Sequence, residues 1–185
     1  NQIINFTFPH IGNVGTNKDD NETIKSFASG IITREPPPEG SNWRSELNFN
    51  KWLKEQNIIG IYGLDTRQLT KVIKEKNAPM GLISHNVDSQ FDLNLLFKEL
   101  FNHPKLKGSN LVPKVSSGGV SEWEDILWGK NKFKNQKTEI HVVAYDFGIK
   151  ENILRCLKNL NIKVSVVPFD FDFVELKKLK PDGIF

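Results

Sequence analysis

The chain has 185 residues, of which 38% are hydrophobic and 25% are charged, a balance that excludes a disordered chain and predicts one domain, or one domain and part of another. The net charge of +3 comes mainly from scattered lysines, and no nucleic-acid-binding pattern accompanies them, so we predict no nucleic-acid partner. The sequence has a single cysteine, which predicts that there is no disulfide framework. It has no apolar run of ~18 residues and no signal-peptide pattern, so we predict a cytoplasmic protein without a membrane partner.

Both ends of the sequence have the pattern of a strand. Residues 1–9 alternate between polar and apolar side chains from the outset, and the apolar pair at 184–185 follows a Pro-Asp-Gly turn. A strand edge leaves backbone groups unpaired, which is costly at a natural terminus. We therefore expect the chain to be a fragment of a longer one.

Short strands and helices alternate over residues 1–115. We expect strands over residues 29–33 and 80–85, the first of them ended by three prolines, and an apolar run fills residues 58–62. We expect three helices: one that begins at Ser41 or Ser45 and ends near Asn57, one that is capped by Asp65 and ends near Asn77, and one that is capped by Asp88 and carries an apolar stripe to Leu100.

The composition changes over residues 116–139, which are rich first in serine and glycine and then in lysine, and we interpret this stretch as a linker. A different pattern fills residues 140–185: a strand over 141–145, a helix over 149–160, a strand over 162–167, a short helix to Lys180 and the start of another strand. This order with short connections predicts an α/β fold that begins a doubly wound parallel sheet.

Asp146-Phe147-Gly148 spells the magnesium-binding motif of protein kinases, but none of the other kinase motifs precedes it. The three residues follow the first strand of the predicted parallel sheet, at the end where such sheets bind ligands. They form either the wall of a site or a simple strand-to-helix turn, and the turn is the more common outcome.

Other candidate sites are weaker still. Gly12–Asn17 has glycines that suit a phosphate-binding loop or a tight turn, but it lacks the lysine of a phosphate loop. The four histidines have no metal-binding spacing, and Cys156 falls within a predicted helix without an adjacent base. The residues by themselves predict no catalytic set, no metal site and no cofactor site.

A series of motifs occurs in order along the chain, at residues 8–17, 30–34, 41–44, 64–70, 141–155 and 181–185. In these motifs the chain resembles the small, glutamine-hydrolysing subunit of carbamoyl-phosphate synthetase. The resemblance implies a swivelling β/β/α layered module over residues 1–115 with its first strands missing, a linker over 116–139, and an incomplete flavodoxin-like sheet of the class I glutamine amidotransferase type over 140–185.

The resemblance also implies a function. In this family a Cys-His-Glu triad hydrolyses glutamine, and the ammonia passes to a large subunit that uses bicarbonate, ATP and Mg to make carbamoyl phosphate for pyrimidine and arginine synthesis. No residue of that triad can be carried over to this sequence, because the matching motifs lie beyond Phe185. We expect the chain to be inactive alone, to hold no cofactor, and to have the large subunit as its partner and glutamine as the substrate of the complete protein. The alternative is a non-catalytic interaction module that reuses the layered domain.

The matched motifs also supply residues that either pack or contact a partner, of which packing is the more common role: His10, Asn13, Asn42, Trp43, Arg44, Asp65 and Arg67. Asp65 suits a helix cap, where its charge also complements the helix dipole. Aromatic and arginine side chains are the usual anchors of protein interfaces, which makes Trp43, Arg44 and Arg67 candidates for docking.

Overall fold

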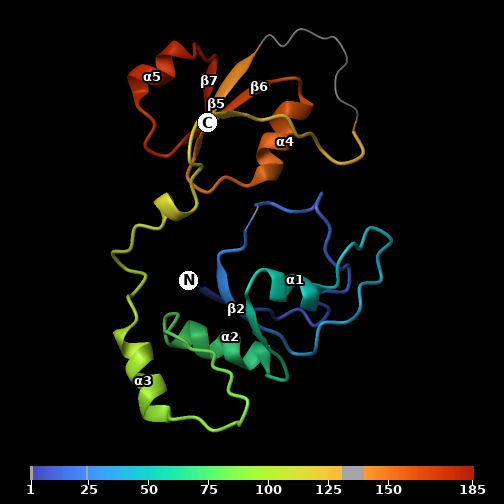
Figure 1. Ribbon diagram of the computed structural model, residues 1–185, viewed down its shortest axis with the longest axis vertical. Helices are drawn as coiled ribbons and strands as arrows, with labels where there is room; N and C mark the ends of the chain where they lie inside the picture. Colours follow the sequence, from blue (N-terminus) through green and yellow to red (C-terminus); the bar gives the residue numbers. More distant parts are fainter. Residues whose placement is uncertain (1, 24, 131–139) are drawn as a thin grey trace. The chain divides into compact units, whose positions relative to one another are not determined.

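The computed structural model, shown in Figure 1, describes residues 2–23, 25–130 and 140–185. It divides the chain into two compact units. The first unit comprises Asn1–Asp20 and Ile24–Gly108, and the second comprises Asn21–Thr23 and Ser109–Phe185. A three-residue segment from the first part of the sequence is thus a member of the second unit.

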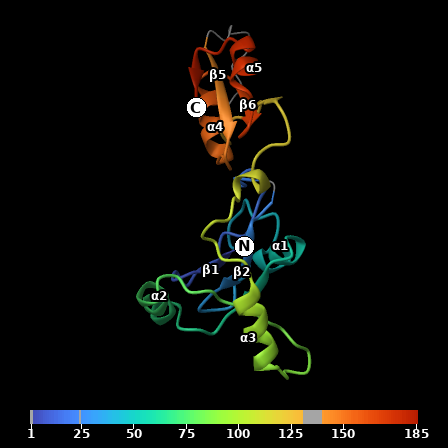
Figure 2. The same ribbon diagram turned by 90° about the vertical axis from the view of Figure 1, so that its left-hand side faces the viewer.

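The first unit contains a three-stranded parallel sheet in the order β1-β2-β3. Its strands are β1 (Gln2–Asn5), β2 (Ala28–Ile32) and β3 (Ile59–Ile61). Helices α1 (Phe49–Glu55) and α2 (Thr66–Glu75) lie on opposite sides of the sheet, as Figures 1 and 2 show, and α3 (Leu93–Asn102) follows them. The buried core of this unit joins Leu53 of α1 to Ile31 and Ile58.

Two helices of the first unit begin later than the sequence predicts. Helix α1 is capped by Asn48, whose side chain accepts a hydrogen bond from the Asn50 N–H, so the expected starts at Ser41 or Ser45 are wrong. Ser41 instead donates its hydroxyl to Asn13. Side-chain oxygens of Ser, Asn and Asp compete for such positions, and tertiary contacts decide which one caps the helix.

Helix α3 is capped by Asp92 rather than by Asp88. Asp88 lies one turn earlier, where its backbone N–H donates to the side chain of Asn86. The strand expected over residues 80–85 is also wrong, because this segment forms no ladder. In contrast, the Asp65 cap of α2 is confirmed: its carboxylate accepts the N–H groups of Arg67 and Gln68.

The second unit contains a four-stranded sheet in the order β4-β6-β5-β7. Strands β5 (His141–Asp146), β6 (Lys163–Pro168) and β7 (Gly183–Ile184) are parallel, which confirms the predicted doubly wound pattern. Helices α4 (Glu151–Asn159) and α5 (Phe173–Lys178) connect them, and a short 3-10 turn, η1 (Val112–Lys114), precedes the sheet.

Strand β4 (Ser121–Glu122) pairs antiparallel with β6 and lies inside the range that the sequence suggests as a linker. The last part of that range, residues 131–139, lies outside the described residues.

Each face of the second sheet is covered by one helix, and Figure 2 shows α4 and α5 on opposite sides of β5 and β6. On one face Leu154 of α4 packs against Ala144 and Val164, and on the other Leu176 of α5 packs against Val143 and Val167. Burying a leucine side chain contributes about 1.5–3 kcal/mol. These two leucines therefore anchor the helices that frame the carboxyl edge of the sheet. No helix in the described part of the chain is long and apolar enough to cross a membrane.

Candidate functional site

The carboxyl edge of the second sheet is the best candidate site. Strand β5 lies in the middle of the sheet, with β6 on one side and β7 on the other. The connection from β5 runs to β6 on one side, and the next connection crosses back to β7 on the other side. Such a reversal of strand order opens a crevice outside the carboxyl ends of the strands. Asp146 is the last residue of β5 and lies at this edge.

Asp146 is only 8% exposed, and both of its carboxylate oxygens are engaged by backbone donors. Oδ1 accepts the N–H groups of Gly148 and Ile149, both at 2.9 Å, and Oδ2 accepts the N–H of Ser117 at 2.7 Å. A carboxylate with three short backbone hydrogen bonds has a structural role, because it holds the donating segments together. We call this carboxylate and its three hydrogen bonds the Asp146 bracket. It ties the segment before β4 to the turn that leads into α4.

Gly148 completes this turn for a steric reason. Its φ of +97° belongs to the left-handed region that side chains rarely adopt, and a Cβ at this position would lie 2.9 Å from Cγ2 of Val115. Phe147, between the bracket and the glycine, is 59% exposed. Its ring centroid lies 6.1 Å from that of Tyr145 and 6.5 Å from that of Phe169, which follows β6. Among the three predicted site-wall residues, Phe147 alone presents a large surface to a ligand.

Ser116 and Ser117 join this edge, although the sequence pattern places them in a linker. The hydroxyl of Ser116 accepts the N–H of Phe169 at 3.0 Å, so it holds the end of β6 as Asp146 holds the end of β5. The Ser117 hydroxyl is buried and has no hydrogen-bond partner among the described residues. The only signal in the sequence was the Ser-Ser-Gly-Gly composition, which is equally typical of a flexible linker.

The thiol and the imidazole of the second unit lie away from this edge. Cys156 is exposed on α4, and its Sγ lies 4.0 Å from Nδ2 of Asn152, one turn earlier in the helix. His141 begins β5 at the opposite end of the sheet, with its Nε2 2.8 Å from Oγ of the buried Ser165. Within the described residues no cluster of three or more His, Cys, Asp or Glu side chains could hold a metal. The edge can therefore form one wall of a site, and neither the Cys156 thiol nor the His141 imidazole lies on it.

In the first unit, the loops around residues 8–20 and 37–48 bring several predicted residues together. The Asn13 carbonyl accepts the N–H of Ser41 at 2.8 Å, and the Asn42 side chain accepts the N–H of Arg44 at 2.8 Å. His10 makes an edge-on ring contact with Phe8 at 5.5 Å between centroids. These contacts give Asn13 and Asn42 a role in folding the loops.

Arg44 braces the same loops through its charge. Its Nη2 lies 2.9 Å from an Asp20 oxygen and 3.6 Å from an Asp19 oxygen, and its side chain is 21% exposed. Trp43, the preceding residue, is 81% exposed. Arg44 is therefore held by ion pairs within the first unit, whereas most of the Trp43 side chain is exposed.

Asp65 and Arg67 lie at the start of α2 and act together through the backbone. The N–H of Gln68, and to a smaller extent the Arg34 charge, hold the pKa of Asp65 below its ordinary value of 3.8. Arg67 adds its own N–H to this cap, and its side chain is exposed.

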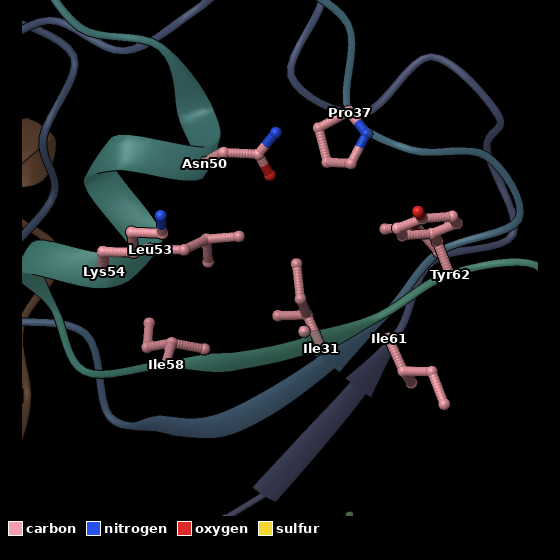
Figure 3. Close-up of a pocket in the computed structure, with 10 residues that line it drawn as sticks. Ile31, Pro37, Asn50, Leu53, Lys54, Ile58, Ile61 and Tyr62 are labelled. Carbon is pink, nitrogen blue, oxygen red and sulfur yellow. The ribbon is translucent and has the colours of Figure 1, made fainter. Parts of the chain in front are cut away.

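Figure 3 shows an apolar pocket of about 460 Å³ in the first unit, between α1 and strands β2 and β3. Asn50, Leu53 and Lys54 of α1 line one side of it, and Ile31 and Ile58 line the side next to the strands. Its lining residues include no carboxylate and no imidazole, and the titratable groups among them are Lys54 and Tyr62.

Comparison with known proteins finds a family match for two parts of the chain. Residues 1–83 match the carbamoyl-phosphate synthase small chain, CPSase domain, and residues 143–185 match the class-I glutamine amidotransferases. The carbamoyl phosphate synthase small chain of Bradyrhizobium diazoefficiens is 44% identical over 190 residues, which cover 100% of this chain and 48% of that protein. The small chains of Zymomonas mobilis and Mesorhizobium japonicum are 42% and 40% identical, again over 100% of this chain and over 50% and 48% of their own lengths. The chain thus spans about half the length of the curated relatives it matches.

Proposed function

This chain belongs to the carbamoyl-phosphate synthase small chain family, and from that premise we propose that it is part of a glutaminase subunit that supplies ammonia for the synthesis of carbamoyl phosphate. The observation that carries the proposal is that the amidotransferase match begins in β5 and covers the edge built around Asp146. That match also favours a glutaminase part over a non-catalytic interaction module.

We propose that residues 1–115 are the small-chain amino-terminal domain, a swivelling β/β/α layered module, and that 116–139 link it to the start of the amidotransferase domain at 140–185. The parallel sheets of the two units are consistent with this division. The observed compact units differ from it in detail, because residues 109–115 and 21–23 pack with the second unit.

In the complete protein, we propose that Phe147 forms part of the wall of the glutamine site. Amide hydrolysis by this route needs a thiolate, a base within ~3 Å of it and backbone donors for the developing oxyanion. The Asp146 bracket would hold the wall rigid, and the thiolate and base would come from the part of the protein that this chain does not contain. Cys156 would not be that thiolate, since its thiol is exposed on α4 and its hydrogen-bond contact among the described residues is the Asn152 amide, at 4.0 Å from Sγ, and not a base.

We propose that the partner is the large subunit, which would receive the ammonia and bind ATP and Mg. The complex would work in the cytoplasm and supply carbamoyl phosphate for arginine or pyrimidine synthesis. Trp43 supports this proposal, since a largely exposed tryptophan beside an ordered loop is a typical interface anchor. Arg44 would hold the loop around residues 37–48, which carries Trp43, through its ion pairs with Asp19 and Asp20.

Two measurements test the proposal. The purified 185-residue chain should release no ammonia from glutamine, and Cys156→Ser should change nothing. The complete protein should hydrolyse glutamine, and Phe147→Ala there should raise KM for glutamine. Turnover by the 185-residue chain that Cys156→Ser abolishes would refute the assignment of the catalytic groups, and a complete protein without glutaminase activity would refute the function.

A further inference from the structure

Helix α4 begins without a cap from its own neighbourhood. The residue at its N-cap position is Lys150, whose side chain makes no capping hydrogen bond. The first N–H groups of any helix have no acceptor within the helix and need one from outside. The start of α4 therefore depends on another part of the chain.

Glu22 supplies the missing acceptors. Its backbone carbonyl accepts the N–H of Glu151 at 3.2 Å, and its carboxylate Oε2 accepts the N–H of Asn152 at 2.9 Å. The second of these bonds spans 130 positions in the sequence. A negative charge at this end of a helix also complements the helix dipole.

The same segment satisfies a buried cation. The Arg155 side chain is 10% exposed, and its Nη2 lies 2.7 Å from Oε2 of Glu151. Its Nη1 donates to the carbonyl of Asn21 at 2.9 Å, and Lys150 Nζ lies 3.2 Å from Glu22 Oε1. A buried charge is costly unless it is paired and hydrogen-bonded, so Asn21 and Glu22 remove a cost that the second unit would otherwise carry.

We propose that residues 21–23 are the N-terminal cap of α4, so that the second unit is completed by a segment from the other part of the sequence. This device goes beyond the proposed function and does not depend on it. Because α4 follows directly on the turn at 147–149, the cap also fixes one end of the candidate site.

Amide hydrogen exchange of the full 185-residue chain tests the cap. A capping side chain typically contributes about 1 kcal/mol, which corresponds to about a fivefold change in an opening equilibrium. Glu22→Ala should therefore accelerate exchange at Asn152 and Ile153 by about fivefold or more. Glu22→Gln keeps an acceptor oxygen but loses the charge, so its acceleration should be smaller.

Glu75→Gln is the matched control, since it removes the same charge from an exposed position at the end of α2 and should leave α4 unchanged. Amides of α5 report on the rest of the second unit and should keep their protection in Glu22→Gln. Unchanged exchange at Asn152 in Glu22→Ala would overturn the proposal. Equal acceleration of α4 and α5 in Glu22→Gln would overturn it as well, because the segment would then act on the whole unit and not on the helix end.

Discussion

Replacement of Asp146 tests whether the carboxyl edge is held by its carboxylate. Asp146→Asn can keep the oxygen that faces Gly148 and Ile149, but it turns an amide NH₂ toward the Ser117 N–H, now 2.7 Å from Oδ2. A hydrogen bond to a charged group contributes about 1.5–3 kcal/mol, so the free energy of unfolding of the second unit should fall by about 2–3 kcal/mol. Asp146→Ala loses all three bonds and should cost about 4 kcal/mol or more.

Native-state hydrogen exchange of buried β5 amides as a function of urea measures this free energy for the second unit alone. Asp170→Asn is the control, because it makes the same chemical change on an exposed residue of the same unit and should have almost no effect. If Asp146→Asn proved as stable as Asp170→Asn, the bracket would contribute nothing. If it proved as unstable as Asp146→Ala, the two bonds to Oδ1 would be unimportant.

Three further predictions concern other positions. Gly148→Ala should destabilise the second unit by about 1–3 kcal/mol, since the residue has a positive φ and its new methyl group would meet Val115, whereas Gly119→Ala, with nothing within 4 Å, should be nearly neutral in thermal melts. The lowered pKa of Asp65 means that its charge stabilises α2 fully above the unfolded-state value of 3.8 and loses this effect as pH falls through the folded-state value. Asp65→Asn should thus melt below the parent chain at pH 7 and approach it in acid, and a constant difference in circular-dichroism melts would contradict this. Phe101 on α3 is 76% exposed, and exposed apolar side chains favour association, so we expect the chain to self-associate at high concentration. Phe101→Lys should reduce this association in sedimentation, and equal association of both chains would rule out α3 as the contact.

The elements of the second sheet could be predicted because local pattern and final environment agree. Residues 142–145 and 164–167, the interiors of the two strands, are mainly apolar, as suits strands covered on both faces, and Leu154 falls on the helix face that packs on them. In the first unit the local signals are ambiguous. Several capping residues compete near the starts of α1 and α3, and the apolar run at 80–85 does not find a strand partner in the structure.

The candidate site was predictable only in outline. A motif after the first parallel strand points to the carboxyl edge, which places Phe147 there. The partners that shape this edge come from distant segments: Ser117 bonds to Asp146 across 29 positions, and Glu22 bonds to Asn152 across 130. Neither pairing follows from a periodicity or from a motif, because both depend on how the chain folds back.

The order β4-β6-β5-β7 has a consequence for how the sheet is assembled during synthesis. Among the parallel strands of this sheet the ribosome releases β5 first. Strand β5 takes a central position, and β6 and then β7 pair on its two sides. Strand β4 precedes both β5 and β6 in the sequence and pairs antiparallel with β6, on the side of β6 away from β5. During translation β6 therefore emerges after both of its neighbours in the sheet, and it can pair with β4 and β5 as soon as it is released.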